Sequence, residues 1–140
     1  MTTGRILSQY NVGAQTRRTK NTVWHDEDRV EIHPHDAEQR GIKDGDWAGI
    51  TSRAGETVLR AKITERVQPG VVYTTFHFPE SGANVITTEN SDWATNCPEY
   101  KVTAVQVMHV SQPSEWQQRY HRFSEEQIQL LQARKQKISA

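Results

Sequence analysis

Apolar and polar residues alternate over 59–67, and this period of two predicts a half-buried strand because successive strand side chains point to opposite faces. Shorter β-branched or aromatic runs predict further strands, and glycine- or proline-containing turns separate them. These strands are expected over 30–32, 47–52, 71–76, 83–88 and 101–110, with Val102, Ala104, Val105 and Val107 of the last strand available to the core. The pattern indicates a mainly β (β-rich α+β) domain.

Two segments carry helical signals instead. Residues 33–41 predict a short helix, because Pro34 suits its first turn and Gly41 suits its end. After Pro113 the apolar residues take partial helical spacing, and Ser114 can cap a helix. The apolar positions there are Trp116, Tyr120, Phe123, Ile128 and Leu131. We therefore expect one β domain of about six strands, a barrel or sandwich, over 1–110 and a C-terminal helical extension or tail over 111–140, packed on the barrel.

Composition narrows the function classes. Lys and Arg together number 17, as do Asp and Glu, so the net charge is zero and no basic stripe favours nucleic acid. No apolar run reaches the ~20 residues of a membrane-spanning helix, and the start does not resemble a signal peptide. The single cysteine, Cys97, excludes an internal disulfide. We expect a cytoplasmic protein that binds neither nucleic acid nor membrane.

Polar residues that do not suit a core gather in a first segment, residues 3–19. Its glycines allow a backbone to approach a ligand, and its arginines and backbone N–H groups suit pyrophosphate oxygens. Gln9, Asn11 and Gln15 can donate and accept, as the edge of a heterocycle requires. The alternative is that this N-terminal segment is solvated and binds no ligand.

Three later segments also attract attention. His77 lies between Phe76 and Phe78, and it either packs against a flat heterocycle or is a structural histidine. Asn84 precedes an apolar run and is either a ligand contact or a turn residue. Residues 90–101 form a long polar loop, a surface excursion or a lid, in which Lys101 could reach a phosphate or a ring oxygen.

Other constellations point to no chemistry. The run from His33 to Asp36 has nothing nearby to complete a metal-ligand set. Cys97 with His77 could suggest a cysteine hydrolase, but no strand-to-helix nucleophile turn surrounds Cys97. The sequence also contains no Gly-x-Gly-x-x-Gly motif and no P-loop.

Taken in order, these segments resemble the C-terminal cofactor domain of the molybdopterin oxidoreductase family. More narrowly, they resemble the end of the catalytic alpha subunit of cytoplasmic NAD-dependent formate dehydrogenases. The resemblance covers residues 2 to about 110, and the run from Ser91 to Lys101 is its most specific part. The matching runs are 10–19, 45–55, 72–77, 83–88 and 91–101.

The resemblance implies a double-psi β-barrel whose loops close over a bis-molybdopterin guanine dinucleotide (bis-MGD) carrying Mo or W. It assigns Arg5 and Gln9 to Asn11 to the first cofactor loop, and Phe76 and His77 to a loop that faces a pterin. Asn84, Tyr100 and Lys101 match later polar contacts. The implied cofactor-binding residues are Thr3, Gly4, Arg5, Gln9, Tyr10, Asn11, Phe76, His77, Asn84, Tyr100 and Lys101.

The family's metal ligand, catalytic histidine and arginine, and iron–sulfur cysteines lie in earlier domains, so the resemblance implies no catalytic residue and no metal ligand in this chain. Oxidation of formate to CO2, with electrons passed to NAD, would belong to the whole enzyme. The implied partners are the remainder of the catalytic subunit and its electron-transfer subunits.

Several alternatives stay open. The chain could be an excised domain, or a small subunit of a split enzyme, as in formylmethanofuran dehydrogenases. It could be a regulatory module that has lost the cofactor, although its polar segments look intact. An independent small enzyme on a similar barrel would need its own nucleophile, and no credible one is found. We also expect the loops 1–20 and 89–100 to be mobile in the isolated chain.

Overall fold

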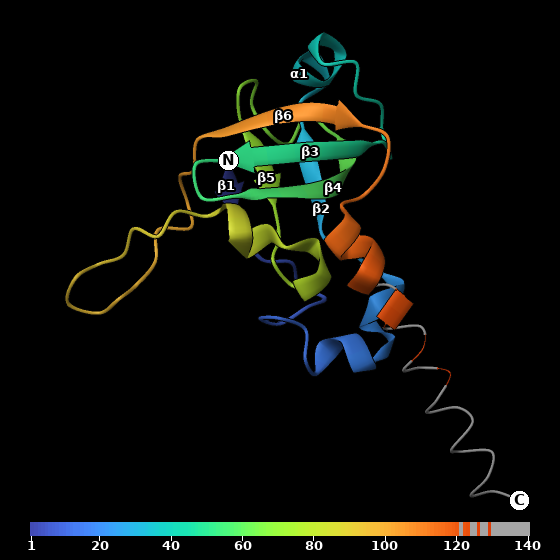
Figure 1. Ribbon diagram of the computed structural model, residues 1–140, viewed down its shortest axis with the longest axis vertical. Coiled ribbons are helices and arrows are strands. Elements are labelled where there is room, and N and C mark those ends of the chain that lie inside the picture. Colours follow the sequence, from blue (N-terminus) through green and yellow to red (C-terminus); the bar gives the residue numbers. More distant parts are fainter. Residues whose placement is uncertain (121, 124–125, 127–128, 130–140) are drawn as a thin grey trace, which may run out of the picture.

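A computed structural model describes residues 1–120, 122–123, 126 and 129 of the chain (Figure 1). Its centre is a mixed six-stranded sheet with the strand order β1-β5-β2-β4-β3-β6. The strands are β1 (Thr2–Thr3), β2 (Arg29–Ile32), β3 (Trp47–Ser52), β4 (Glu56–Ile63), β5 (Val72–Thr74) and β6 (Val105–Val110). The prediction of a mainly β domain is confirmed.

The sheet brings its two edge strands together. β2 runs parallel to β4 and antiparallel to β5, while β3 pairs antiparallel with β4 and β6. At the far edge, β1 runs parallel to β5. The Met1 amino group donates to the Thr103 carbonyl at 2.6 Å, and Thr103 N donates back to Met1 O at 3.0 Å. These bonds join the start of β1 to the residues just before β6, so the sheet curls back on itself.

The core is formed by the buried residues of the strands, and in β4 these follow the alternation predicted from the sequence. In β4, Thr57, Leu59 and Ala61 are buried, while the residues between them are more accessible. The strands predicted over 30–32 and 47–52 are present as β2 and β3, and each buries apolar residues. The buried apolar cluster consists of Val30, Ile32, Ala37, Ile42, Ala48, Ile50, Leu59, Ala61, Val72 and Ile86.

The predicted short helix is present as α1 (Pro34–Gln39), which sits at one end of the sheet (Figure 1). His33 caps it by accepting a hydrogen bond from His35 N at 3.2 Å. Buried Asp36 accepts a bond from Gly70 N at 2.6 Å and so ties the helix to the turn before β5. His33 and His35 thus form the N-terminal cap of this helix together, through the His33 ring and the His35 backbone N–H.

The strand predicted over 59–67 ends at Ile63, and the one predicted over 71–76 is limited to Val72–Thr74. Two further strand predictions were wrong over more of their length. Residues 83–88 contain the 3-10 helix η4 (Ala83–Ile86) instead of a strand, because left-handed Gly82 (φ 63°) turns the chain, and only Ala83 and Ile86 of this helix are buried. The last strand begins at Val105 and not at residue 101. Val102 is 81% exposed and Ala104 is exposed, so neither joins the core, whereas Val105 and Val107 pack against it.

A helix follows Pro113, as the sequence indicates, and is described over 115–120. Ser114 Oγ accepts a hydrogen bond from Gln117 N at 3.2 Å, which caps it. Buried Gln117 also donates to Val58 O of β4 at 2.5 Å, so the helix is anchored on the sheet. Ile128 and Leu131 lie outside the described residues.

Most of the loops gather at the end of the sheet opposite α1 (Figure 1). They include η1 (Thr16–Arg18), η2 (Lys20–Val23) and η3 (Pro79–Ser81), together with η4. Residues 90–100, called the arm below, project from this end as a long excursion (Figure 1). Within the described part of the chain, no helix is long and apolar enough to cross a membrane.

Candidate functional site

A cavity of about 460 Å³ opens between the first loop, the end of β5, η4 and the base of the arm. Six of its seven lining residues are among those that the sequence resemblance implied. The lining residues are Arg5, Asn11, Val12, Phe76, Asn84, Tyr100 and Lys101. The fold therefore assembles one site from segments that are up to 96 positions apart in the sequence, from Arg5 to Lys101.

The wall of this cavity combines flat, cationic and amide groups. The rings of Phe76 and Tyr100 lie 6.2 Å apart at an interplanar angle of 29°. The Arg5 guanidinium lies 6.0 Å from the centre of the Phe76 ring. Aromatic faces suit a flat heterocycle, the two cations suit phosphate oxygens, and the amides of Asn11 and Asn84 can both donate and accept. The volume is within the usual range for a small-molecule site, ~300–1,000 Å³.

Buried Thr3 of β1 positions the residues at the base of the arm. Its hydroxyl donates to Tyr100 O at 2.9 Å, and its carbonyl accepts from Lys101 Nζ at 2.7 Å. Since Gly4 N also bonds Thr74 O at 3.0 Å, this stretch is fixed to β5. Thr3 thus acts behind the cavity, not on its lining.

Gly4 is required by packing within the chain. A Cβ atom at Gly4 would stand 2.5 Å from the Tyr73 ring, which is closer than real Cβ contacts. The Tyr73 hydroxyl donates to Arg5 O at 3.4 Å on the same side. The glycine therefore lets the backbone cross a tyrosine ring and deliver Arg5 to the cavity edge.

His77 is fully buried, and both ring nitrogens have partners in the first loop. Nε2 accepts a hydrogen bond from Ile6 N at 3.2 Å, and Nδ1 lies 2.5 Å from Asn11 O, which can only accept. This pattern fits the tautomer with its proton on Nδ1. His77 thus fixes the first loop from the buried side. These contacts fit the structural role, one of the two alternatives that the sequence left open for His77.

Gln9 and Tyr10 are also outside the cavity lining. Buried Gln9 donates to His25 O at 3.3 Å and accepts from the Thr16 hydroxyl at 2.6 Å, so both ends of its amide are used within the loop. The Tyr10 side chain is 65% exposed, and its backbone N–H donates to the same Thr16 hydroxyl at 3.1 Å. Gln9 therefore shapes the loop that carries Asn11.

Asp28 organises the site, and the sequence reading missed it. Its buried carboxylate accepts from His77 N at 3.1 Å, Phe78 N at 3.0 Å and the Ser81 hydroxyl at 2.7 Å, and also from the Thr75 hydroxyl. It thereby holds the turn between β5 and η3. The one signal in the sequence was its position directly before a buried strand, which does not separate it from an ordinary turn residue.

Arg17, one of the arginines considered for pyrophosphate, is engaged elsewhere. It forms two bonds with the Glu80 carboxylate, at 2.5 and 3.0 Å, and its guanidinium lies 4.8 Å from the centre of the Phe78 ring. Buried Gly13 (φ 70°) permits this, because a Cβ there would stand 2.5 Å from the Arg17 side chain. Arg5 and Lys101 are the cations on the cavity lining.

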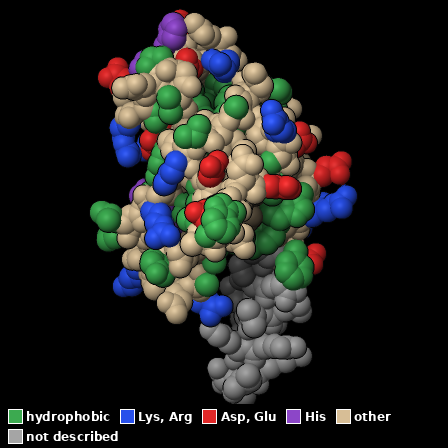
Figure 2. Space-filling model, turned by 90° about the vertical axis from the view of Figure 1, so that its left-hand side faces the viewer, with side chains coloured by type: hydrophobic (Ala, Val, Ile, Leu, Met, Phe, Trp, Pro, Cys, Tyr) green, Lys and Arg blue, Asp and Glu red, His purple; other side chains and the backbone are tan. Residues whose placement is uncertain are grey.

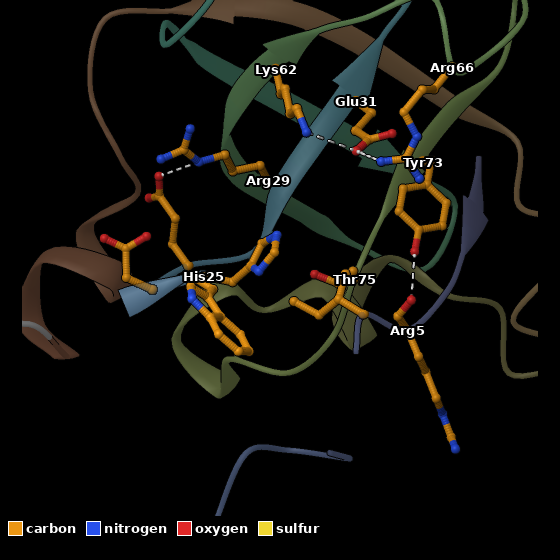
Figure 3. Close-up of a pocket in the computed structure, with 12 residues that line it drawn as sticks. Arg5, His25, Arg29, Glu31, Lys62, Arg66, Tyr73 and Thr75 are labelled. Atoms are coloured by element: carbon orange, nitrogen blue, oxygen red, sulfur yellow. Dashed lines mark hydrogen bonds and ion pairs between the residues drawn. The ribbon is translucent and has the colours of Figure 1, made fainter. Parts of the chain in front are cut away.

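A second, smaller cleft of about 270 Å³ lies across the exposed side of β2, β4 and β5 (Figure 3). Lys62 and Arg66 approach buried Glu31 at 3.5 and 3.2 Å, so much of its charge is paired internally (Figure 3). Burial, followed by the negative charge of Glu31, raises the pKa of Tyr73 above its ordinary value. The Arg5 side chain points away from Glu31 and its two cationic partners (Figure 3).

Among the described residues, no group of three or more His, Cys, Asp or Glu could hold a metal ion.

Comparison with known protein families identifies this arrangement. A family model described as "Molydopterin dinucleotide binding domain" matches residues 1–104, about three quarters of the chain. The chain belongs to this family. The resemblance seen in the sequence is thereby confirmed, and the cavity described above lies within the matched residues.

Relatives of this chain include subunits of a formate dehydrogenase and of a nitrate reductase. It is 45% identical over 108 residues to the "F420-dependent formate dehydrogenase 1 subunit alpha" of Methanococcus maripaludis, covering 76% of this chain and 16% of that protein. It is 33% identical over 110 residues to the "Assimilatory nitrate reductase catalytic subunit" of Bacillus subtilis, covering 77% of this chain and 16% of that protein. The chain thus spans about one sixth of the length of these relatives.

A solved structure supports the fold. The chain matches acetylene hydratase from Pelobacter acetylenicus with a TM-score of 0.66 and 15% sequence identity, covering 78% of this chain and 18% of that one. At this identity the likeness concerns the fold alone. The formate dehydrogenase relative is described as F420-dependent, so the comparisons do not support the predicted transfer of electrons to NAD.

Proposed function

We propose that the chain binds a molybdopterin guanine dinucleotide in the 460 Å³ cavity and cradles it as the C-terminal part of a formate-dehydrogenase-type catalytic subunit. One observation carries this proposal. Residues implied by the family resemblance, from four separate segments, line the same cavity and present chemistry that fits the cofactor.

The lining residues suggest a division of roles. Phe76 and Tyr100 offer flat faces to the pterin, and the Asn11 and Asn84 amides offer hydrogen bonds to the edge of a heterocycle. Arg5 and Lys101 offer positive charge to the pyrophosphate. When bound in bis-MGD form, the cofactor supplies Mo or W for redox chemistry, while these residues bind and orient it.

We propose that residues 1–110 form a double-psi β-barrel and that 111–140 are a helical extension. The main-chain bonds between Met1 and Thr103, which bring the two edges of the sheet together, support a closed barrel. The match in fold to acetylene hydratase from Pelobacter acetylenicus, over 78% of this chain, is compatible with such a domain. The bond from Gln117 to Val58 supports an extension that packs on the barrel.

The whole enzyme in this proposal oxidises formate to CO2. Formate is preferred to nitrate as substrate because identity to three formate dehydrogenase relatives is 42–45%, against 33% and 36% to two nitrate reductases. The proposed partners are the remainder of the catalytic subunit, in the same or a separate chain, and electron-transfer subunits. The acceptor of the electrons would be set by those partners, since this chain would serve as one wall of the cofactor site.

The test uses a chimaeric subunit, the Methanococcus maripaludis alpha subunit in which this chain replaces the matching 108 residues. It is produced in a host that makes the guanine dinucleotide cofactor and assayed for pterin fluorescence and for Mo and W. The chain alone, produced in the same host, is the comparison. We expect stoichiometric pterin and metal in the chimaera and much less in the isolated chain.

A folded chimaera without pterin would refute the cofactor assignment and leave a regulatory module without cofactor as the remaining function. Stoichiometric pterin in the isolated chain would instead refute the view that this domain is only one wall of the site. Formate oxidation by the chimaera, with nitrate as the competing substrate, then tests the choice of reaction.

A further inference from the structure

The arm holds a defined shape through its own main-chain hydrogen bonds. Glu99 N donates to Asn90 O at 3.0 Å, and Asp92 N donates to Cys97 O at 3.0 Å. Asn96 N closes the turn by donating to Asp92 O at 2.8 Å. Since an antiparallel bridge between Ser91 and Pro98 joins the two sides, the arm is a narrow hairpin that projects from the sheet (Figure 1).

The turn of this hairpin presents a tryptophan to solvent. The Asp92 carboxylate accepts from Ala94 N at 2.7 Å and Thr95 N at 2.9 Å, which orders the backbone on both sides of Trp93. The Trp93 side chain is 94% exposed, the most accessible tryptophan among the chain's exposed large apolar residues. A large apolar side chain presented by an ordered turn is typical of an anchor in a protein–protein interface.

The surroundings of Trp93 also resemble such an interface. Its neighbours on the same turn, Asp92, Thr95 and Asn96, are polar and exposed, as expected for the rim around an apolar anchor. Figure 2, which views the molecule from the side where the arm projects, shows apolar side chains standing among charged and polar ones, with both signs of charge interspersed. A partner would therefore bind this face through apolar contacts, since the face does not carry charge of a single sign.

The base of the arm continues into the wall of the cofactor cavity. Tyr100 ends the arm and Lys101 follows it, and both line that cavity. Both are fixed to Thr3 by hydrogen bonds of 2.9 and 2.7 Å. A partner that covers the arm would consequently lie next to the cavity and could close it.

We propose that the arm docks through Trp93 into the remainder of the catalytic subunit, beside the cofactor cavity. This inference rests on the proposed function. We choose the remainder of the catalytic subunit as the partner because this chain spans only 16% of its formate dehydrogenase relatives. In such a protein, the other domains must contact this one. The arm projects clear of the sheet, where a neighbouring domain can contact it (Figure 1).

Cys97, which is exposed on the arm and is the only cysteine of the chain, gives a direct probe of docking. Its rate of labelling by a neutral maleimide is measured by mass spectrometry of the peptide that contains it, in the isolated chain and in the chimaeric subunit. We expect labelling to be at least tenfold slower in the chimaera. Equal rates in the two proteins would overturn the proposal.

Substitution of Trp93 tests whether it is the anchor. In the chimaera, Trp93→Ala should restore Cys97 labelling to within about threefold of the isolated rate, and Trp93→Phe should keep partial protection. The matched control is Trp116→Ala, which removes a 53% exposed tryptophan from the C-terminal helix and should leave protection unchanged. Unchanged protection in Trp93→Ala, or equal loss in both variants, would overturn the role of Trp93.

Pterin content separates this inference from the proposed function. Protected Cys97 in a chimaera without pterin would refute the cofactor assignment and keep the docking. Stoichiometric pterin with freely labelled Cys97 would refute the docking alone. A chimaera that does not fold into a soluble subunit would count against both, because both require this chain to fit where its relatives carry the matching segment.

Discussion

The lining of the cavity and the network behind it use similar polar residues in opposite ways. Arg5, Asn11 and Asn84 stand on the surface, and their side chains face the cavity. Asp28 and His77 are buried, and their polar atoms are bonded within the chain. A buried set of hydrogen bonds thus fixes the loops, so that an exposed set of polar side chains can meet a ligand. Changes to the first set should act on stability and changes to the second on binding.

The largest effect is expected from Asp28→Ala. It would leave two backbone N–H groups and two hydroxyls without their buried acceptor, and each such loss costs about 1–3 kcal/mol. We expect the free energy of unfolding to fall by about 3–5 kcal/mol, measured by urea denaturation. Asp26→Ala, at an exposed neighbour, is the control and should change it by less than ~0.5 kcal/mol. Similar values for both would refute the organising role of Asp28.

The next effect is expected from His77→Leu, which keeps an apolar volume but removes both bonds to the first loop. The loss of these bonds to Ile6 and Asn11 should cost about 2–4 kcal/mol of stability. Hydrogen exchange at the Ile6 amide should accelerate more than exchange in β4. If the loop kept its protection, His77 would not be its tether, and a direct role on the cofactor would gain support.

A smaller effect, on binding alone, is expected from Arg5→Ala. Loss of one charge-assisted contact to a phosphate should weaken pterin retention by the chimaeric subunit about tenfold, or ~1.4 kcal/mol. The melting temperature should stay nearly unchanged because the Arg5 side chain is exposed. Arg18→Ala, an exposed arginine of η1 that does not line the cavity, is the matched control. Equal retention in the two variants would remove Arg5 from the site.

The smallest effect concerns pH. Burial and Glu31 raise the pKa of Tyr73 in the folded chain, so the unfolded chain releases this proton first, near pH 10. Stability should therefore be intact below pH 10 and fall as the pH rises through the folded pKa. Tyr73→Phe should lack this part of the loss, a difference under about 1 kcal/mol because solvent screens the half-exposed ring. Parallel stability curves from pH 9 to 11 would contradict it.

The sequence predicted the strands where one face is buried and the other is not. β4 repeats with a period of two and buries Thr57, Leu59 and Ala61 on one side of that repeat. The prediction failed at Ile86 and Val102, where a local apolar run does not reveal whether the chain pairs with a neighbour. A strand needs a partner at a distant position, and no local pattern contains that information.

The candidate site shows the same division. The hydrophobic pattern predicted the mainly β fold, and the motif resemblance predicted the family and the residue types of a heterocycle and phosphate site. That Arg5 and Asn84 share a cavity, while Gln9 and His77 are buried, became clear from the three-dimensional arrangement. The reason is physical: side-chain chemistry is local, but burial and hydrogen-bond partners depend on which distant segments the fold brings together.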